Sequence, residues 1–117
     1  MTDKIKTGSI GEKLAAEFMI KKGFRVVKTN YRWKHAEIDL IVQRGDWLIF
    51  IEVKTRNSNA FGEPESFVSK DQRRQIYKAA EEYIFSTDWN GHIRFDIISV
   101  KPGNIPEIVH FEDAIHY

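Results

Sequence analysis

The sequence predicts an α/β domain in which two helices and five strands are mixed around one sheet, in the order α-β-β-β-α-β-β. Two segments carry apolar residues at helical spacing, and the segments between and after them alternate or are rich in β-branched and aromatic residues. A chain of 117 residues hides about two thirds of its unfolded surface on folding, which is enough for one hydrophobic core. We therefore expect a single domain over residues 1–117.

The two helices are expected where capping boxes precede helical periodicity. Ser9 with Glu12 has this spacing and predicts a first helix that ends at Gly23, a residue type favoured in the left-handed position after a helix. On this helix Glu12 falls beside the apolar residues and therefore points towards the protein body. Ser69 with Gln72 predicts a second helix up to about residue 85.

The strands are expected where apolar and polar residues alternate between turn signals. They are Phe24–Tyr31, Ala36–Val42, Trp47–Thr55, His92–Val100 and Ile105–Phe111. In the second strand, strict alternation puts Ile38 and Leu40 on one face and Asp39 on the other. Residues 56–68 contain Asn, Ser, Gly and Pro and predict a long loop.

The composition is that of a globular protein without strong overall charge. Hydrophobic residues make up 42% and charged residues 30%, and the net charge is +1. A nucleic-acid partner would therefore have to be bound by a local basic patch. The absence of cysteine excludes disulfides, thiol catalysis and thiolate metal sites. There is no signal-peptide pattern and no apolar run long enough to span a membrane, so we expect a cytoplasmic protein with no membrane partner.

Acidic residues recur on two neighbouring predicted strands. Asp39 lies on one strand, and Glu52 and Lys54 lie on the next. A two-residue type II′ turn with Gly45 first places Asp39 opposite Glu52 and Glu37 opposite Lys54, and alternation puts all four side chains on one face. A longer loop would shift this register, so the pairing is a hypothesis.

Two carboxylates in this arrangement repel each other. At about 5 Å and an effective dielectric of 20 the repulsion is roughly 3 kcal/mol. A hard divalent cation, Mg²⁺ or Mn²⁺, takes oxygen ligands and would turn this repulsion into binding. Ordinary explanations remain for each part alone, since Glu-x-Lys on a strand is usually a solvated face and Glu12 alone fits a helix cap better than a ligand.

The combined pattern resembles a known superfamily of nucleases. Asp39 followed by Glu52-Val53-Lys54, in the order α-β-β-β-α-β, is similar to the PD-(D/E)xK core, with a restriction-endonuclease-like mixed sheet flanked by helices. More closely, the chain resembles the YraN family of small bacterial proteins, predicted endonucleases similar to archaeal Holliday junction resolvases. The motifs that carry the resemblance are Gly11-Glu12, Asn30, Glu37-Ile38-Asp39-Leu40-Ile41, Ile51-Glu52-Val53-Lys54-Thr55-Arg56, Lys70 and Arg94-Phe95-Asp96. Ala36 departs from the pattern, which usually has Gly before Glu-Ile-Asp.

The resemblance implies a site and a reaction. Glu12, Asp39 and Glu52 would be metal ligands and catalytic residues, Lys54 the catalytic lysine, and the backbone carbonyl of Val53 a further ligand. The implied cofactor is Mg²⁺ or Mn²⁺. The implied function is endonucleolytic hydrolysis of DNA phosphodiester bonds, in branched or damaged DNA among other substrates.

Basic residues after the third strand and on the second helix are candidates for phosphate contacts. They are Arg56, Lys70, Arg73 and Arg74. Arg94 and Asp96 share a strand face and are expected to form an ion pair that supports the sheet. The histidines show no metal-ligand spacing, and His35 is expected to be a loop residue.

Two other functions remain open at this stage. The chain could be a nucleic-acid-binding protein that keeps the nuclease fold without catalysis. It could also be a protein-interaction module whose Trp and Phe side chains form a dimer face, and a homodimer would suit a two-fold-symmetric DNA junction as well.

Overall fold

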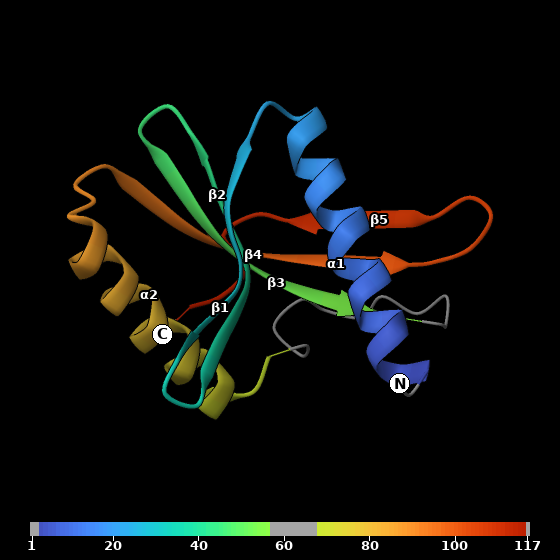
Figure 1. Cartoon of the computed structure of the whole chain (residues 1–117), viewed down its shortest axis with the longest axis horizontal. Helices are drawn as coiled ribbons and strands as arrows, with labels where there is room; N and C mark the ends of the chain where they lie inside the picture. The colour runs from blue at the N-terminus through green and yellow to red at the C-terminus, as the bar shows by residue number, and fades with distance from the viewer. Residues whose placement is uncertain (1–2, 57–67, 117) are drawn as a thin grey trace.

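Two helices and five strands follow one another in the predicted order in the computed structural model, which describes residues 3–56 and 68–116 (Figure 1). The elements are α1 (Asp3–Lys21), β1 (Arg25–Trp33), β2 (Ala36–Arg44), β3 (Trp47–Thr55), α2 (Lys70–Thr87), β4 (His92–Lys101) and β5 (Glu107–Phe111). The α/β fold class is therefore confirmed. Most of the predicted loop 56–68 lies outside the described residues.

The strands form one mixed sheet in sequence order, β1-β2-β3-β4-β5. All neighbours are antiparallel except β3 and β4, which are parallel and joined through α2. A parallel pair needs such a crossover connection. The mixed sheet and this connection agree with an αβββαβ nuclease-like core.

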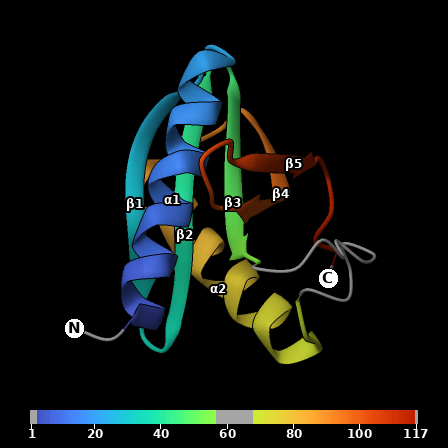
Figure 2. The same cartoon turned by 90° about the vertical axis from the view of Figure 1, so that its right-hand side faces the viewer.

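The helices cover opposite faces of the sheet, with α1 and α2 on either side of it in Figures 1 and 2. Ala15 and Met19 of α1 pack on a core that includes Ile49 and Ile51 of β3. The α2 face is a separate core, in which Ile76 packs with the alternate β3 residues, such as Phe50. Alternation in β3 thus supplies both cores. No helix in the described ranges is long and apolar enough to cross a membrane.

Local sequence signals account for several boundaries. Ser69 is the N-cap of α2, and its hydroxyl accepts a hydrogen bond from the backbone N–H of Gln72 at 3.1 Å. Gly23 has a φ of 94° after α1 and donates its N–H to the carbonyl of Ile20. Gly45 has a φ of 60°, and the β2–β3 register starts at Arg44 opposite Trp47, as the type II′ turn predicts.

The capping box predicted at Ser9 and Glu12 is wrong. α1 begins at Asp3, so both residues lie inside the helix. The segment before Ser9 contains no proline, and its single glycine lowers helix stability by only ~1 kcal/mol, so nothing in it ends the helix. Glu12 therefore does not cap the helix.

Strict alternation also fails in the middle of β2. Ile38 packs in the core under α2, whereas Leu40 packs in the core under α1. The prediction placed both side chains on one face. The face changes at Asp39, which lies between them, and this break opens the candidate site.

Candidate active site

Asp39 and Glu52 form a buried carboxyl pair at the point where β2 and β3 separate. The backbone pairing runs from Arg44–Trp47 to Leu40–Ile51, and Asp39 and Glu52 are the next residues in that register. Asp39 is 9% exposed and Glu52 is 8% exposed. The backbone N–H of Val53 donates to Oδ2 of Asp39 at 2.8 Å. A side-chain acceptor therefore serves this N–H, and the predicted proximity of the two acids is confirmed.

β1 is irregular at the same level of the sheet. Asn30 lies between Thr29, paired with Leu40, and Tyr31, paired with Ile38, so its position is across from Asp39. It has a φ of 49°, a left-handed conformation that is uncommon outside glycine and that asparagine tolerates best. Strained backbone positions cluster at functional sites. The distortion here points the Asn30 amide at two acidic side chains.

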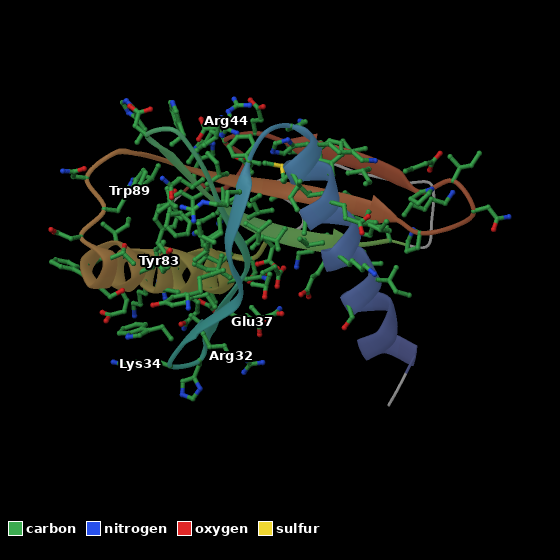
Figure 3. The ribbon with its side chains drawn as sticks, turned by 45° about the horizontal axis from the view of Figure 1, so that its top comes forward. Arg32, Lys34, Glu37, Arg44, Tyr83 and Trp89 are labelled. Atoms are coloured by element: carbon green, nitrogen blue, oxygen red, sulfur yellow. The ribbon has the colours of Figure 1, made fainter. Side chains whose placement is uncertain are left out.

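The Asn30 amide links Glu12 on α1 to Glu37 on β2. Its Nδ2 donates to Oε1 of Glu12 at 2.7 Å and to Oε1 of Glu37 at 3.1 Å. Arg32 pairs with the other oxygen of Glu37 at 3.0 Å, and both residues lie towards the tip of the β1–β2 hairpin (Figure 3). Through Asn30, Glu12 on the helix is therefore held next to Glu37 on the strand.

Gly11 lets α1 come close enough to the sheet for this contact. A Cβ at this buried position would collide with Oγ1 of Thr55, at the end of β3. Only glycine permits that separation between the helix backbone and the strand. The next residue on α1 is Glu12, so the close approach positions a half-buried carboxylate near the pair.

The electrostatics favour one proton on the carboxyl pair. Burial raises the pKa of Glu52 to about 9, and the charge of Asp39 and its hydrogen bond to Glu52 add to the rise, against the lowering effect of Lys54. Burial also raises the pKa of Asp39, while hydrogen bonds from Glu52 and Val53 oppose the rise. At neutral pH, Glu52 is therefore the protonated partner that donates to the Asp39 carboxylate.

Glu12 shows the same tendency. Burial raises the pKa of its carboxyl group; the hydrogen bond from Asn30 opposes this, and the charges of Asp39 and Glu37 add to it. The pKa values of Glu12, Asp39 and Glu52 are thus all raised, and burial is the largest cause for each. Raised pKa values that gather in one region are typical of functional sites.

Lys54 is the cation that the sequence predicted beside the pair. Its Nζ lies 4.0 Å from Oε1 of Glu52, and its side chain is 21% exposed. This distance is too long for a hydrogen bond, and the positive charge of Lys54 lowers the pKa of Glu52 against the effect of burial.

An acidic pocket of about 330 Å³ opens beside the pair. Its described lining is His35, Ala36, Glu37, Asp39, Glu52, Gln72, Gln75 and Ile76. From the sequence, Gln72 was predicted only as a capping residue and Gln75 was not predicted at all. Their spacing along α2 with the buried Ile76 was the available signal, because it turns both amides towards the sheet.

The oxygen-rich donors suit a hard divalent cation in kind, since carboxylates and backbone carbonyls are the ligands that Mg²⁺ and Mn²⁺ take. In residues 3–56 and 68–116, however, no group of three or more His, Asp or Glu side chains stands arranged to hold a metal ion. Asp39 and Glu52 are hydrogen-bonded to each other, and Glu12 is held by Asn30.

Three of the predicted phosphate-binding residues gather at the start of α2. Lys70, Arg73 and Arg74 line a pocket of about 380 Å³ together with His116, a residue that no sequence motif singled out. Arg74 also pairs with Asp71 at 3.6 Å.

Arg56 follows β3, where its backbone N–H donates to the Val100 carbonyl at 2.7 Å. It is not among the described residues that line this pocket.

The expected Arg94–Asp96 pair is confirmed as a support of the sheet. Two guanidinium nitrogens of Arg94 donate to the fully buried Asp96, each at 2.9 Å. His110 of β5 contacts the same carboxylate at 2.7 Å. These charges neutralise one another on the far strands and do not join the acidic pocket.

The order of elements and the mixed sheet define the class of fold, an αβββαβ nuclease-like α/β core that carries acids on its second and third strands. The chain belongs to the family described as Uncharacterised protein family UPF0102, the YraN family, whose sequence model matches residues 11–100.

Relatives in this family match nearly end to end. A UPF0102 protein of Flavobacterium psychrophilum is 42% identical and covers 100% of this chain and 99% of its own length. One of Christiangramia forsetii is 38% identical with the same coverage, and one of Rhodococcus opacus is 36% identical over 97% of this chain and 99% of its own. A solved structure of Pyrococcus furiosus SfsA in complex with Ca²⁺ has a TM-score of 0.35 and 14% identity, covering 97% of this chain and 65% of its own, which is too distant to bear on function.

Proposed function

We propose that this chain is a metal-dependent endonuclease that hydrolyses DNA phosphodiester bonds, with branched or damaged DNA as candidate substrates. The observation that carries the proposal is the buried Asp39–Glu52 pair with Lys54 at 4.0 Å from it. Burying two like-charged groups side by side is unfavourable unless a positive group or a proton lies between them.

Mg²⁺ or Mn²⁺ would be held by Asp39 and Glu52, with Glu12 and the Val53 carbonyl as the further ligands that the family resemblance implies. Such an ion supplies an activated water and stabilises the charge that develops on a phosphate. Without a cation, the proton on the Asp39–Glu52 pair neutralises one of the two negative charges.

The side chains around the pair have separate tasks in this proposal. Lys54 stabilises the charge on the attacked phosphate or holds the attacking water. Asn30 orients Glu12 through its 2.7 Å hydrogen bond. Lys70, Arg73 and Arg74 contact phosphates further along the backbone of the nucleic acid.

Cleavage assays with Mg²⁺ or Mn²⁺ on duplex, flap and four-way-junction DNA test this function. We expect cleavage by the wild type, and a loss of about 100-fold or more in kcat for Lys54→Met, because one electrostatic stabiliser of the transition state is removed. Asp39→Asn should lose activity as well, through its metal affinity.

Glu17→Gln is the matched control for Asp39→Asn, because it makes the same chemical change on an exposed position of α1. Activity that is unchanged in Asp39→Asn and Lys54→Met would show that these roles are assigned wrongly.

One observation favours a second function, nucleic-acid binding without cleavage. Within the described part of the chain, no three His, Asp or Glu side chains are arranged so that they could hold a metal ion. Binding to DNA with no cleavage in either metal would select this alternative.

A further inference from the structure

A second pocket adjoins the acidic pocket and has no role in the proposed chemistry. It measures about 530 Å³ and lies between the tip of the β1–β2 hairpin and α2. His35 and Gln75 line both pockets. The two pockets therefore adjoin at these two residues, and the volume of the second pocket is in the range of ligand sites.

Aromatic rings stand at this second pocket. Phe85 of α2 is 77% exposed, so its ring is open to solvent beside this pocket. Trp33 is half-buried, and the ammonium group of Lys34 lies 4.6 Å from the centre of its ring. Lys34 thus covers one face of Trp33, and Phe85 is the exposed ring on which a flat ligand can stack.

The charged groups of the second pocket have both signs. Lys34 and Lys78 supply donors, and Glu81 and Glu82 supply acceptors. The two carboxylates disfavour a phosphate, whereas a nucleobase presents π faces together with hydrogen-bond donors and acceptors. The chemistry of the pocket therefore fits a base better than a backbone.

We infer that this second pocket binds an unpaired nucleobase of the strand whose phosphate lies at the acidic pair. The inference rests on the proposed function and specifies its substrate class, a nucleic acid with an unpaired nucleotide next to the cleaved phosphate. A paired base cannot reach the pocket, because its faces are covered by its neighbours in the stack.

The test compares an oligothymidylate with an abasic oligonucleotide of the same length, which has the same phosphates and no bases. Dissociation constants are measured by fluorescence anisotropy without metal, and kcat/KM with Mg²⁺. Stacking of one base on an aromatic ring predicts that wild type prefers the oligothymidylate by about 5- to 150-fold, the equivalent of ~1–3 kcal/mol. Phe85→Ala should remove most of this preference.

Ile105→Ala is the matched control, because Ile105 is 87% exposed and lies between β4 and β5, outside the described lining of both pockets. It should keep the full preference. The inference is overturned if the wild type binds both oligonucleotides equally, or if Phe85→Ala keeps the full preference. The second pocket would then bind another partner, such as a protein. A base preference without cleavage supports the inference and rejects the endonuclease.

Discussion

Glu52 is a carboxyl group that its surroundings hold in the neutral form. Burial raises its pKa from an ordinary 4.5 to about 9, and the adjacent Asp39 adds to the rise. Between these two pH values the folded chain binds more protons than the unfolded chain. The free energy of unfolding must therefore fall as the pH rises through this range. Ionisation of Glu52 therefore destabilises the metal-free fold at alkaline pH.

Glu52→Gln tests this linkage, because an amide of the same shape is neutral at every pH. We expect the metal-free wild type to lose stability as the pH rises between about 4.5 and 9, and the variant to lose less and to be the more stable at the upper end. Urea unfolding over this pH series is the measurement. The exposed Glu17→Gln should follow the wild type. Parallel curves for wild type and Glu52→Gln would contradict the prediction.

At the scale of elements, the site depends on how closely α1 docks on the sheet. Gly11 faces Thr55 at the end of β3 without room for a Cβ, and the following residue is Glu12. The helix that packs through Ala15 and Met19 therefore also sets the position of one acid. The packing of α1 on the sheet therefore determines where Glu12 lies relative to the other acids.

Gly11→Ala should separate α1 from β3. The new methyl group collides with the Thr55 hydroxyl, and overpacking of this kind costs about 1–3 kcal/mol of stability. Because Glu12 moves with the helix, affinity for Mg²⁺ in calorimetry should fall as well. Thr55→Ala in the same chain removes the colliding atom and should restore both properties.

Gly103→Ala is the matched control, because a Cβ there meets nothing within 4 Å. A Gly11→Ala variant as stable as Gly103→Ala would show that the approach of α1 does not limit the site.

Local chemistry explains which parts of this arrangement the sequence could predict. The turn at Gly45 sets the β2–β3 register, and the register brings Asp39 to Glu52. The capping signal at Ser69 was equally local and correct, whereas the one at Ser9 was wrong because such a pair is also stable inside a helix. The hydrogen bonds from Asn30 to Glu12 and Glu37 depend on the left-handed backbone conformation of Asn30 and on the packing of α1, β1 and β2, so no local sequence pattern predicts them.

In the whole molecule, the candidate site lies where the β2–β3 pairing ends, and residues from both faces of the sheet contribute to it. Glu12 reaches it from α1 on one face, and Gln75 reaches it from α2 on the other. The chain carries a net charge of only +1, so long-range attraction of a polyanion is weak. Under the proposed function, affinity for nucleic acid would depend on where the cations lie, and three of them line one pocket at the start of α2.

This dependence predicts how salt affects binding. Replacing Lys70, Arg73 and Arg74 with Ala should weaken DNA binding and lower the slope of log Kd against log salt by about 2–3, because each cation that no longer meets a phosphate leaves roughly one counterion on the DNA. The comparison is a variant with Ala at the exposed Lys13, Lys21 and Lys28 on α1 and β1.

Both triple variants lack three positive charges and therefore share the same net charge. If the protein binds through the α2 pocket, only the first should change the slope, measured by anisotropy from low to high salt. Equal slopes in the two variants would show that the cations act through the total charge of the molecule, and the position of α2 beside the acidic pocket would then have no part in holding the DNA.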